Sequence, residues 1–221
     1  MKYKNYKFQI SCDGGAATGK STGAKLISKK YNLKFLSSGL LYRYASYLII
    51  KYKPKNENFF LKEKFKKLDF NKLNKINLHT QEISKHTSEL AKKNKIRNIL
   101  KKFQINFSKK NKRCCIEGRD ISTKIIPKSD VKFFFICKLN IAASRRFKEL
   151  KKGNKKIKFN DVKKALRIRN ISDLTRKNSP LLKHRDSIII DTGKLNKPAM
   201  LAKMSKYIDK KLIKNGNWTR N

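Results

Sequence analysis

The sequence contains a glycine-rich stretch that ends on a lysine and two hydroxyl residues, a combination suited to holding phosphate groups. Residues 10–22 read ISCDGGAATGKST. An apolar run breaks there into glycines, and the spacing from Gly14 to Gly19, Lys20 and Ser21 fits the P-loop pattern. The glycines let successive backbone N–H groups point inward at phosphate oxygens, and the helix that follows adds its positive end.

We therefore predict that this loop binds the phosphates of a nucleoside triphosphate. Lys20 would place a mobile ammonium on the β- and γ-phosphates, and the Ser21 hydroxyl would reach a Mg²⁺ ion. A chance glycine turn is the alternative, but the preceding strand, the spacing, the lysine and the serine all disfavour it. The predicted ATP-binding residues are Gly14, Gly15, Ala16, Ala17, Thr18, Gly19, Lys20, Ser21 and Thr22.

Two further motifs place anion-binding groups directly after strand-like runs. The first reads SSGLLYR at residues 37–43, a Ser-Ser-Gly turn that opens a helix with Arg43 one helical turn into it. The second reads EGRDIST at residues 117–123. It puts Arg119 and Asp120 at the carboxyl end of a strand, where open α/β sheets bind ligands. Both motifs favour a second anion site that faces the phosphate loop.

A third group of charged residues lies in a basic segment that has no strand pattern. Arg169, Asp173 and Arg176 fall at i, i+4 and i+7, so a helix would carry all of them on one face. Cations that meet the charge on a moving phosphoryl group are what a small-acceptor kinase needs. The base-reading motif N-K-x-D of GTPases does not occur in the sequence, which disfavours a GTPase. A motor ATPase would need a longer chain than these 221 residues.

The elements that must position these motifs alternate along the chain. Short apolar runs bounded by polar or turn residues are typical of buried parallel strands, and they occur at residues 7–12, 33–36, 113–116, 132–137 and 187–190. Helical stretches are predicted at residues 21–31, 40–51, 80–93, 95–107 and 197–213. This alternation predicts an α/β fold, a five-stranded parallel sheet with helices on both faces.

Taken together, the motifs resemble the bacterial cytidylate kinase family. The resemblance covers the chain from about residue 7 to residue 192, and its stretches occur in the family's order. They read DGGAATGKST, SSGLLYR, HTQEISKHTSELAKKNKIR, IEGRDISTKIIPKSDVKFFF, RRFKEL, RNISDLTRKNSPL and IIIDT. One motif alone would be weak, whereas so many in the same order are specific.

The resemblance implies a single P-loop kinase domain over residues 1–221, with a nucleoside-monophosphate-binding insert at residues 53–97 and an arginine-rich lid at residues 146–185. The family transfers the γ-phosphoryl group of ATP, with Mg²⁺, to CMP or dCMP and so makes CDP or dCDP plus ADP. The catalytic residues implied are Lys20, Arg119, Arg169 and Arg176. The CMP-binding residues implied are Ser38, Arg43, Ser88, Arg97, Arg119, Asp120, Arg169 and Asp173.

The chemistry of cytosine agrees with the base-reading residues that the resemblance implies. Asp120 would accept the amino proton of cytosine, while Arg97 and Ser88 would donate to its ring and carbonyl acceptors. A uracil would turn a carbonyl toward the carboxylate, which disfavours UMP. The alternatives are a surface charge for Arg97, a surface hydroxyl for Ser88 and a cap of the following segment for Asp120.

Two departures from the family pattern concern the metal and the acceptor. The family usually has Asp-Ser-Gly after its second strand, whereas this chain has Ser37 at the first of these positions. The loss removes a negative charge near the Mg²⁺ ion, so the metal would depend more on Ser21, water and the phosphates. The insert is also short, with room at residues 54–78 for a helix or two and little sheet.

The composition leaves a second class of function open. The chain carries 58 Lys and Arg against 15 Asp and Glu, a net charge of +43, which would attract RNA or anionic membranes. The lysines are spread along the whole chain, so compositional bias with a solvated surface is the favoured interpretation. The rivals to the CMP kinase are a kinase for UMP, AMP or shikimate and a basic RNA-binding protein with a non-catalytic P-loop.

The remaining expectations concern the environment and partners of the protein. The cysteines, Cys12, Cys114, Cys115 and Cys137, lack zinc-ligand spacing, so we expect reduced thiols in a cytosol. We see no signal peptide and no apolar stretch of about 18 residues, the length that spans a membrane. We therefore expect a cytoplasmic monomer whose partners are ATP, CMP and dCMP, with no membrane and no specific nucleic acid.

Overall fold

The computed structural model describes residues 6–69, 73, 76–153 and 156–214. The chain divides into two compact units. The first unit comprises residues 1–36 and 108–221, and the second unit comprises residues 37–107. Among the described residues, no helix combines the length and the apolar character that crossing a membrane requires.

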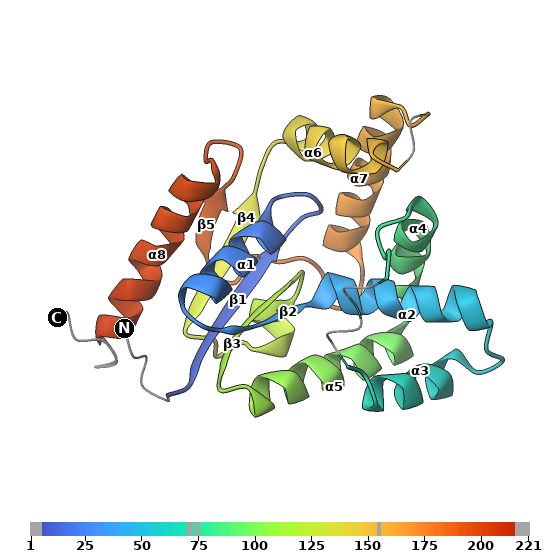
Figure 1. The fold of residues 1–221 in the computed structure, drawn as a ribbon, viewed down its shortest axis with the longest axis horizontal. Coiled ribbons are helices and arrows are strands. Elements are labelled where there is room, and N and C mark those ends of the chain that lie inside the picture. Colours follow the sequence, from blue (N-terminus) through green and yellow to red (C-terminus); the bar gives the residue numbers. More distant parts are fainter. Residues whose placement is uncertain (1–5, 70–72, 74–75, 154–155, 215–221) are drawn as a thin grey trace. The chain divides into compact units, whose positions relative to one another are not determined.

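The first unit is built on a five-stranded parallel sheet, as the sequence predicts (Figure 1). Its strands are β1 (Phe8–Gly14), β2 (Lys34–Ser37), β3 (Arg113–Gly118), β4 (Val131–Ile136) and β5 (Ile188–Asp191). Their order across the sheet is β2-β3-β1-β4-β5, so β1 lies at the centre. The central strand therefore delivers the phosphate loop to the middle of the sheet's carboxyl edge, which is where open α/β sheets bind ligands.

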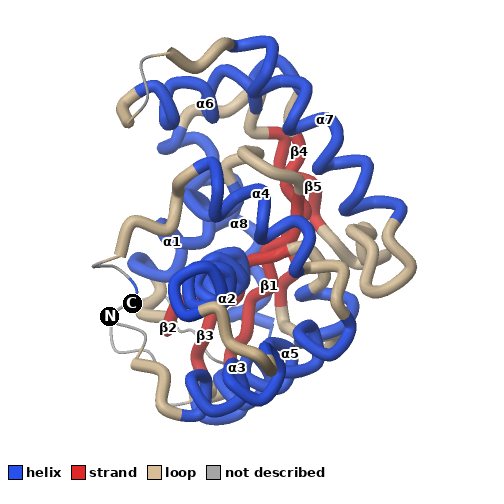
Figure 2. The backbone as a smooth tube through the Cα atoms, turned by 90° about the vertical axis from the view of Figure 1, so that its right-hand side faces the viewer, coloured by secondary structure: helices blue, strands red, loops and turns tan. Residues whose placement is uncertain are grey.

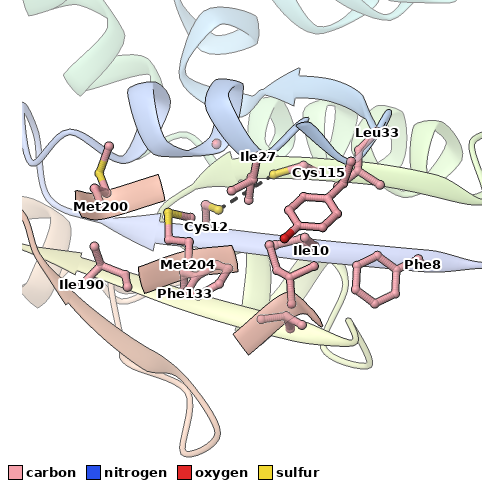
Figure 3. Close-up of a cluster of buried hydrophobic side chains, with 14 of the residues drawn as sticks. Phe8, Ile10, Cys12, Ile27, Leu33, Cys115, Phe133, Ile190, Met200 and Met204 are labelled. Carbon is pink, nitrogen blue, oxygen red and sulfur yellow. Dashed lines mark hydrogen bonds between the residues drawn. The ribbon is translucent and has the colours of Figure 1, made fainter. Parts of the chain in front are cut away.

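One face of the sheet packs against two helices, α1 (Lys20–Lys30) and α8 (Lys197–Lys214). The alternating residues Phe8, Ile10 and Cys12 of β1 point into this core, because successive strand side chains face opposite sides. Figure 3 shows them against Ile27 of α1 and Met204 of α8. Burying a large apolar side chain stabilises the fold by about 1.5–3 kcal/mol. This core therefore fixes β1, which precedes the phosphate loop, against α1, which follows it.

The cysteines in these strands are free thiols, as predicted, and Cys12, Cys114 and Cys115 are buried. The sulfur atoms of Cys12 and Cys115 lie 3.8 Å apart on neighbouring strands (Figure 3). Burial raises the pKa of the Cys12 thiol well above its usual value, and it raises that of Cys114 to about 12. Both thiols are therefore kept in the protonated form that packs as a small apolar group.

Three further elements of the first unit follow the carboxyl ends of β3 and β4. The short π-helix η2 (Ile121–Ile125) begins directly after Arg119 and Asp120. Helices α6 (Leu139–Lys151) and α7 (Phe159–Thr175) lie side by side in both views (Figures 1 and 2). Their contact is made by small and branched side chains, among them Ala142, Ala143, Val162 and Leu166. The described residues of the basic segment 146–185 thus contain no strand.

The second unit is built from helices α2 (Ser38–Tyr52), α3 (Glu57–Lys66), α4 (Gln81–Leu90) and most of α5 (Asn94–Lys110). Polar side chains begin these helices: Ser37 accepts a hydrogen bond from Leu40 N at α2, and Thr80 accepts one from Ile83 N at α4. The described residues between positions 53 and 79 form α3 and no strand. The described part of residues 54–78 thus contains a helix, as expected, while the role of this segment as an insert stays a prediction.

Candidate active site

The phosphate loop connects β1 to α1 and depends on glycine at two positions. A Cβ atom on Gly14 would lie 2.5 Å from the backbone oxygen of Phe135, so no larger residue fits there. Gly19 has φ 83°, in the left-handed region, and it is the residue from which α1 starts. The loop thereby turns its backbone into the first turn of α1, where unpaired N–H groups favour an anion.

Lys20 is held in a buried position beneath this loop. Its ammonium donates a hydrogen bond to Gly15 O at 3.0 Å and lies 3.8 Å from the carboxylate of Glu117. Burial and, to a smaller extent, the nearby Arg119 lower the pKa of Lys20 to about 7, while Glu117 opposes the shift. A lysine whose charged form is disfavoured to this degree gains from an anion, so the arrangement suits a nucleotide phosphate.

A network of ion pairs joins Arg119, just after β3, to Asp173 of α7 and to Arg176, which follows the last residue of that helix in extended backbone and so does not share its face as predicted. The carboxylate of Asp173 accepts a hydrogen bond from Arg119 Nε at 2.7 Å and one from Arg176 Nη1 at 3.1 Å. Burial alone would raise the pKa of Asp173, but the Arg119 guanidinium holds it below its usual value. Burial lowers the pKa of Arg119 while Asp173 more than offsets this, so the guanidinium stays charged. The pairing fixes both arginines in place.

Two neighbouring residues of α7 also interact with the phosphate loop or its lysine. Asn170 accepts a hydrogen bond from the backbone N–H of Ala16 through Oδ1, at 3.2 Å. Burial, together with Arg119, lowers the pKa of Arg169 to about 10. The structure thus brings Lys20, Arg119 and Arg169 into one electrostatic group with Asp173, as the sequence predicts from their spacing and motifs. Asn170 could not be identified from sequence, because nothing in its own neighbourhood distinguishes a helical asparagine.

A third set of contacts ties α6 and the end of β5 to the loop. Arg145 donates hydrogen bonds to the hydroxyl and the backbone oxygen of Thr192, both at 2.8 Å. The hydroxyl of Thr192 in turn donates to Thr18 O at 2.7 Å. Arg145 is an exposed residue of α6 that is nevertheless joined through Thr192 to the phosphate loop. Asp191 caps a turn by accepting a hydrogen bond from Gly193 N at 2.9 Å.

The buried acid Asp13 lies next to the last residue of β1, just before the loop. Its carboxylate accepts hydrogen bonds from Ile121 N and Ser122 N, each at 2.8 Å, and from the Ser122 hydroxyl at 2.6 Å. Burial raises the pKa of Asp13 to about 6, although these hydrogen bonds oppose the shift. Asp120 is also buried, and its side chain does not cap η2. The alternative of a capping role for Asp120 toward that segment is therefore wrong.

The predicted acceptor-binding residues of the second unit have their own partners there. Arg43 is buried and donates to Leu78 O and to the Ser84 hydroxyl, both at 2.9 Å. Ser88 donates to Ser84 O at 3.2 Å, from the helix α4 that also carries Ser84. Ser84 was not predicted as a site residue, because nothing in the sequence distinguishes it from the other serines. Only its contacts with two predicted site residues, Arg43 and Ser88, indicate that it belongs with them.

Arg97 and Ser38 complete the predicted set of the second unit. Arg97 is 7% exposed, donates to Ala91 O at 3.2 Å, and lies with its guanidinium 5.7 Å from the ring centre of Tyr42. The alternative of a surface charge for Arg97 is therefore wrong. Ser38 is the buried first residue of α2. The roles of all these residues toward CMP stay predictions.

The donor groups near the loop suit a magnesium ion that is held mainly by its nucleotide. No cluster of three His, Cys, Asp or Glu side chains that could hold a metal occurs among the described residues. Ser21 is exposed on the first turn of α1 and offers a hard oxygen ligand. Because Mg²⁺ keeps several waters and binds through few protein ligands plus substrate phosphates, such a donor fits the ion.

The sheet and the loop together define the class of protein. A parallel sheet whose central strand leads through a Gly-x-x-x-x-Gly-Lys-Ser loop into a helix is the architecture of P-loop nucleotide-binding proteins. The fold is similar to that of an uncharacterized protein from Eubacterium ventriosum, with a TM-score of 0.55 at 16% identity over 92% of this chain and 99% of the other. It is also similar to that of TT1252 from Thermus thermophilus, with a TM-score of 0.50 at 13% identity over 94% and 99% of the two chains.

Sequence comparison narrows the class to one family. Residues 10–210 match the family model described as cytidylate kinase. The chain is 34% identical to a cytidylate kinase of Bartonella tribocorum over 207 residues, 91% of this chain and 94% of the relative. It is 34% identical to a cytidylate kinase of Rickettsia africae over 93% of each chain. The chain belongs to the cytidylate kinase family, so the resemblance seen in its motifs is confirmed.

Proposed function

We propose that this chain transfers the γ-phosphoryl group of ATP to CMP or dCMP, which gives CDP or dCDP plus ADP. The observation that carries the proposal is the phosphate loop of a cytidylate kinase family member with Lys20 beneath it and the Arg119–Asp173–Arg176 network in the same unit. No covalent enzyme intermediate is needed. The chemistry is positioning of the two substrates plus electrostatic stabilisation of the transferred group.

The cationic side chains bind different phosphate groups according to their positions. Lys20 and the backbone N–H groups of the loop hold the β- and γ-phosphates of ATP. Arg119, Arg169 and Arg176 meet the charge that spreads over the phosphoryl oxygens during transfer, and arginines in such roles contribute about 10³–10⁵ in kcat. Asp173 keeps two of these guanidinium groups aligned, since it pairs with both at hydrogen-bond distance.

The acceptor is recognised by its phosphate and by its base. Ser38 and Arg43 bind the acceptor phosphate, while Asp120, Arg97 and Ser88 read the cytosine edge. The burial of Asp120 and Arg97 supports this assignment, because hydrogen bonds in a water-poor site discriminate strongly between bases. Uracil would leave the Asp120 carboxylate facing a carbonyl, so UMP is expected to be a poor acceptor.

Magnesium accompanies ATP, and Ser21 would hold it through its hydroxyl. When bound, the ion neutralises phosphate charge that the protein cations leave unmet. The residues of the chain itself bind, orient and shield the substrates. The need for ATP supports the predicted cytoplasmic location, and the monomeric state stays a prediction.

The proposal is tested by the release of ADP from ATP and Mg²⁺ with CMP, dCMP, UMP or AMP offered separately. We expect rapid turnover with CMP and dCMP and slow turnover with UMP and AMP. A Lys20→Met variant, which keeps the length of the side chain but not its charge, should lose most of the activity. Turnover of another acceptor in preference to CMP would contradict the proposal, and so would ATP binding without turnover of any acceptor.

A further inference from the structure

The far face of β1 carries a row of buried polar side chains that the hydrophobic core does not explain. Gln9, Ser11 and Asp13 alternate with the apolar core residues and are 6%, 0% and 0% exposed. Gln9 donates to Ser108 O at 2.7 Å, and the hydroxyls of Ser11 and Ser129 lie 2.9 Å apart. Asp13 is the member of this row with a charge, and a buried carboxylate is costly unless its oxygens are fully hydrogen-bonded.

All the partners of Asp13 that the structure defines belong to one short segment. Oδ1 accepts from Ile121 N, and Oδ2 accepts from both the backbone N–H and the hydroxyl of Ser122. These are the first residues of η2, whose own N-cap position, Asp120, makes no side-chain cap. The start of η2 is thus capped from a strand 108 residues earlier in the sequence.

The position of Asp13 links two parts of the proposed reaction. Its backbone continues into Gly14 and the phosphate loop, while its side chain holds the segment that directly follows Arg119 and Asp120. We infer that Asp13 is a positioning residue that keeps Arg119 and Asp120 in register with the phosphate loop. The inference rests on the proposed function, since Arg119 and Asp120 act there on the phosphoryl group and the cytosine.

The chemistry of the contact explains why a carboxylate is needed. The segment presents three donors, and an ionised carboxylate accepts all of them because it carries no hydrogen of its own. An asparagine would turn an NH₂ group toward one of these donors and leave it unpaired. The segment would then shift, and a misplacement of about 1 Å at a reacting group can cost on the order of 10²-fold in rate.

The test compares Asp13→Asn and Ser122→Ala with the matched control Ser11→Ala, which removes a buried hydrogen bond from the same face of the same strand without touching η2. We expect Asp13→Asn to lower kcat/KM for CMP by about 10²-fold while the Kd for ATP changes by less than about 3-fold. Ser122→Ala, which removes one of the three hydrogen bonds, should lower it by about 5- to 10-fold. Ser11→Ala should stay within about 2-fold of wild type.

Amide hydrogen exchange over residues 121–126 provides a readout that does not need activity. Exchange there should accelerate in Asp13→Asn and in Ser122→Ala but not in Ser11→Ala. Unchanged exchange in both η2-directed variants, an equal loss of ATP affinity, or the same kinetic loss in Ser11→Ala would overturn the inference. A wild-type protein that turns over no acceptor would instead overturn the proposed function, and the exchange data would still decide whether Asp13 holds η2.

Discussion

The burial of Lys20 predicts that nucleotide binding takes up a proton. In the free protein the pKa of Lys20 lies at about 7, because burial and Arg119 disfavour its charged form. At a pH near 8 such a group is only about one-tenth protonated. The phosphates of ATP favour the ammonium form and return the pKa toward its ordinary value, at which the group is almost fully protonated. Binding near pH 8 should therefore take up about 0.9 proton per nucleotide.

Isothermal titration calorimetry measures this uptake directly. ATP and Mg²⁺ are titrated, without acceptor, into the protein in buffers of different ionisation enthalpy, and the slope of the observed enthalpy gives the protons exchanged. The uptake assigned to Lys20 should fall to about 0.1 proton near pH 6, where the free lysine is already charged. The sign follows from the free state, which binds fewer protons than the complex at the higher pH.

A Lys20→Arg variant is the matched control, because a guanidinium stays charged throughout this pH range. The difference between wild type and the variant at each pH isolates the contribution of Lys20 from that of any other titrating group. An uptake near zero at pH 8 in the wild type would refute the reasoning. An equal uptake in Lys20→Arg would do the same, since the proton would then bind elsewhere.

Three further variants test other contacts of the site. Asp173→Asn removes the salt bridge of Arg119, so chemical denaturation should show a loss of about 2–4 kcal/mol of stability, and kcat should fall. Unchanged stability together with unchanged kcat would contradict a role for this ion pair. Asn170→Ala frees the Ala16 N–H to bind phosphate, so the Kd for ATP should fall by up to about 5-fold. Weaker ATP binding in this variant would show instead that Asn170 helps to hold the nucleotide. Ser37→Ala removes the cap of α2 and should lower the free energy of unfolding by about 1 kcal/mol. Ser37→Asp should lower it little, because either side chain accepts a hydrogen bond from the same N–H. An equal loss of stability in both variants would rule out the cap.

The strands and the phosphate loop could be predicted from sequence because each is a local pattern. The apolar runs at residues 132–137 and 187–190 correspond to β4 and β5 within one residue at each end. The glycine spacing likewise specifies a loop whose backbone only glycine can adopt at Gly19. One boundary that differed is explained by a cap. Helix α2 starts at Ser38 and not at the predicted residue 40, because Ser37 caps it.

The parts that could not be predicted depend on contacts between distant residues. Asn170 reaches the phosphate loop across 154 positions of sequence, and Asp13 reaches η2 across 108. Asn170 carries no local signal at all. Asp13 is recognisable only as an acid near the end of a buried strand. Arg97 lies in a lysine-rich helix that looks solvated, yet it is buried against Tyr42. Local patterns specify the elements, whereas the partners of a buried polar group follow from packing alone.

The measurement that tests the account most directly is the ratio of kcat/KM for CMP to that for UMP, in wild type and in Asp120→Asn. We expect a ratio on the order of 10⁴ for the wild type, because uracil would face the Asp120 carboxylate with a carbonyl. The ratio should collapse in Asp120→Asn, whose amide can donate to that carbonyl. A wild-type ratio near unity, or a ratio that survives the substitution, would contradict the assignment of Asp120 as the residue that reads cytosine.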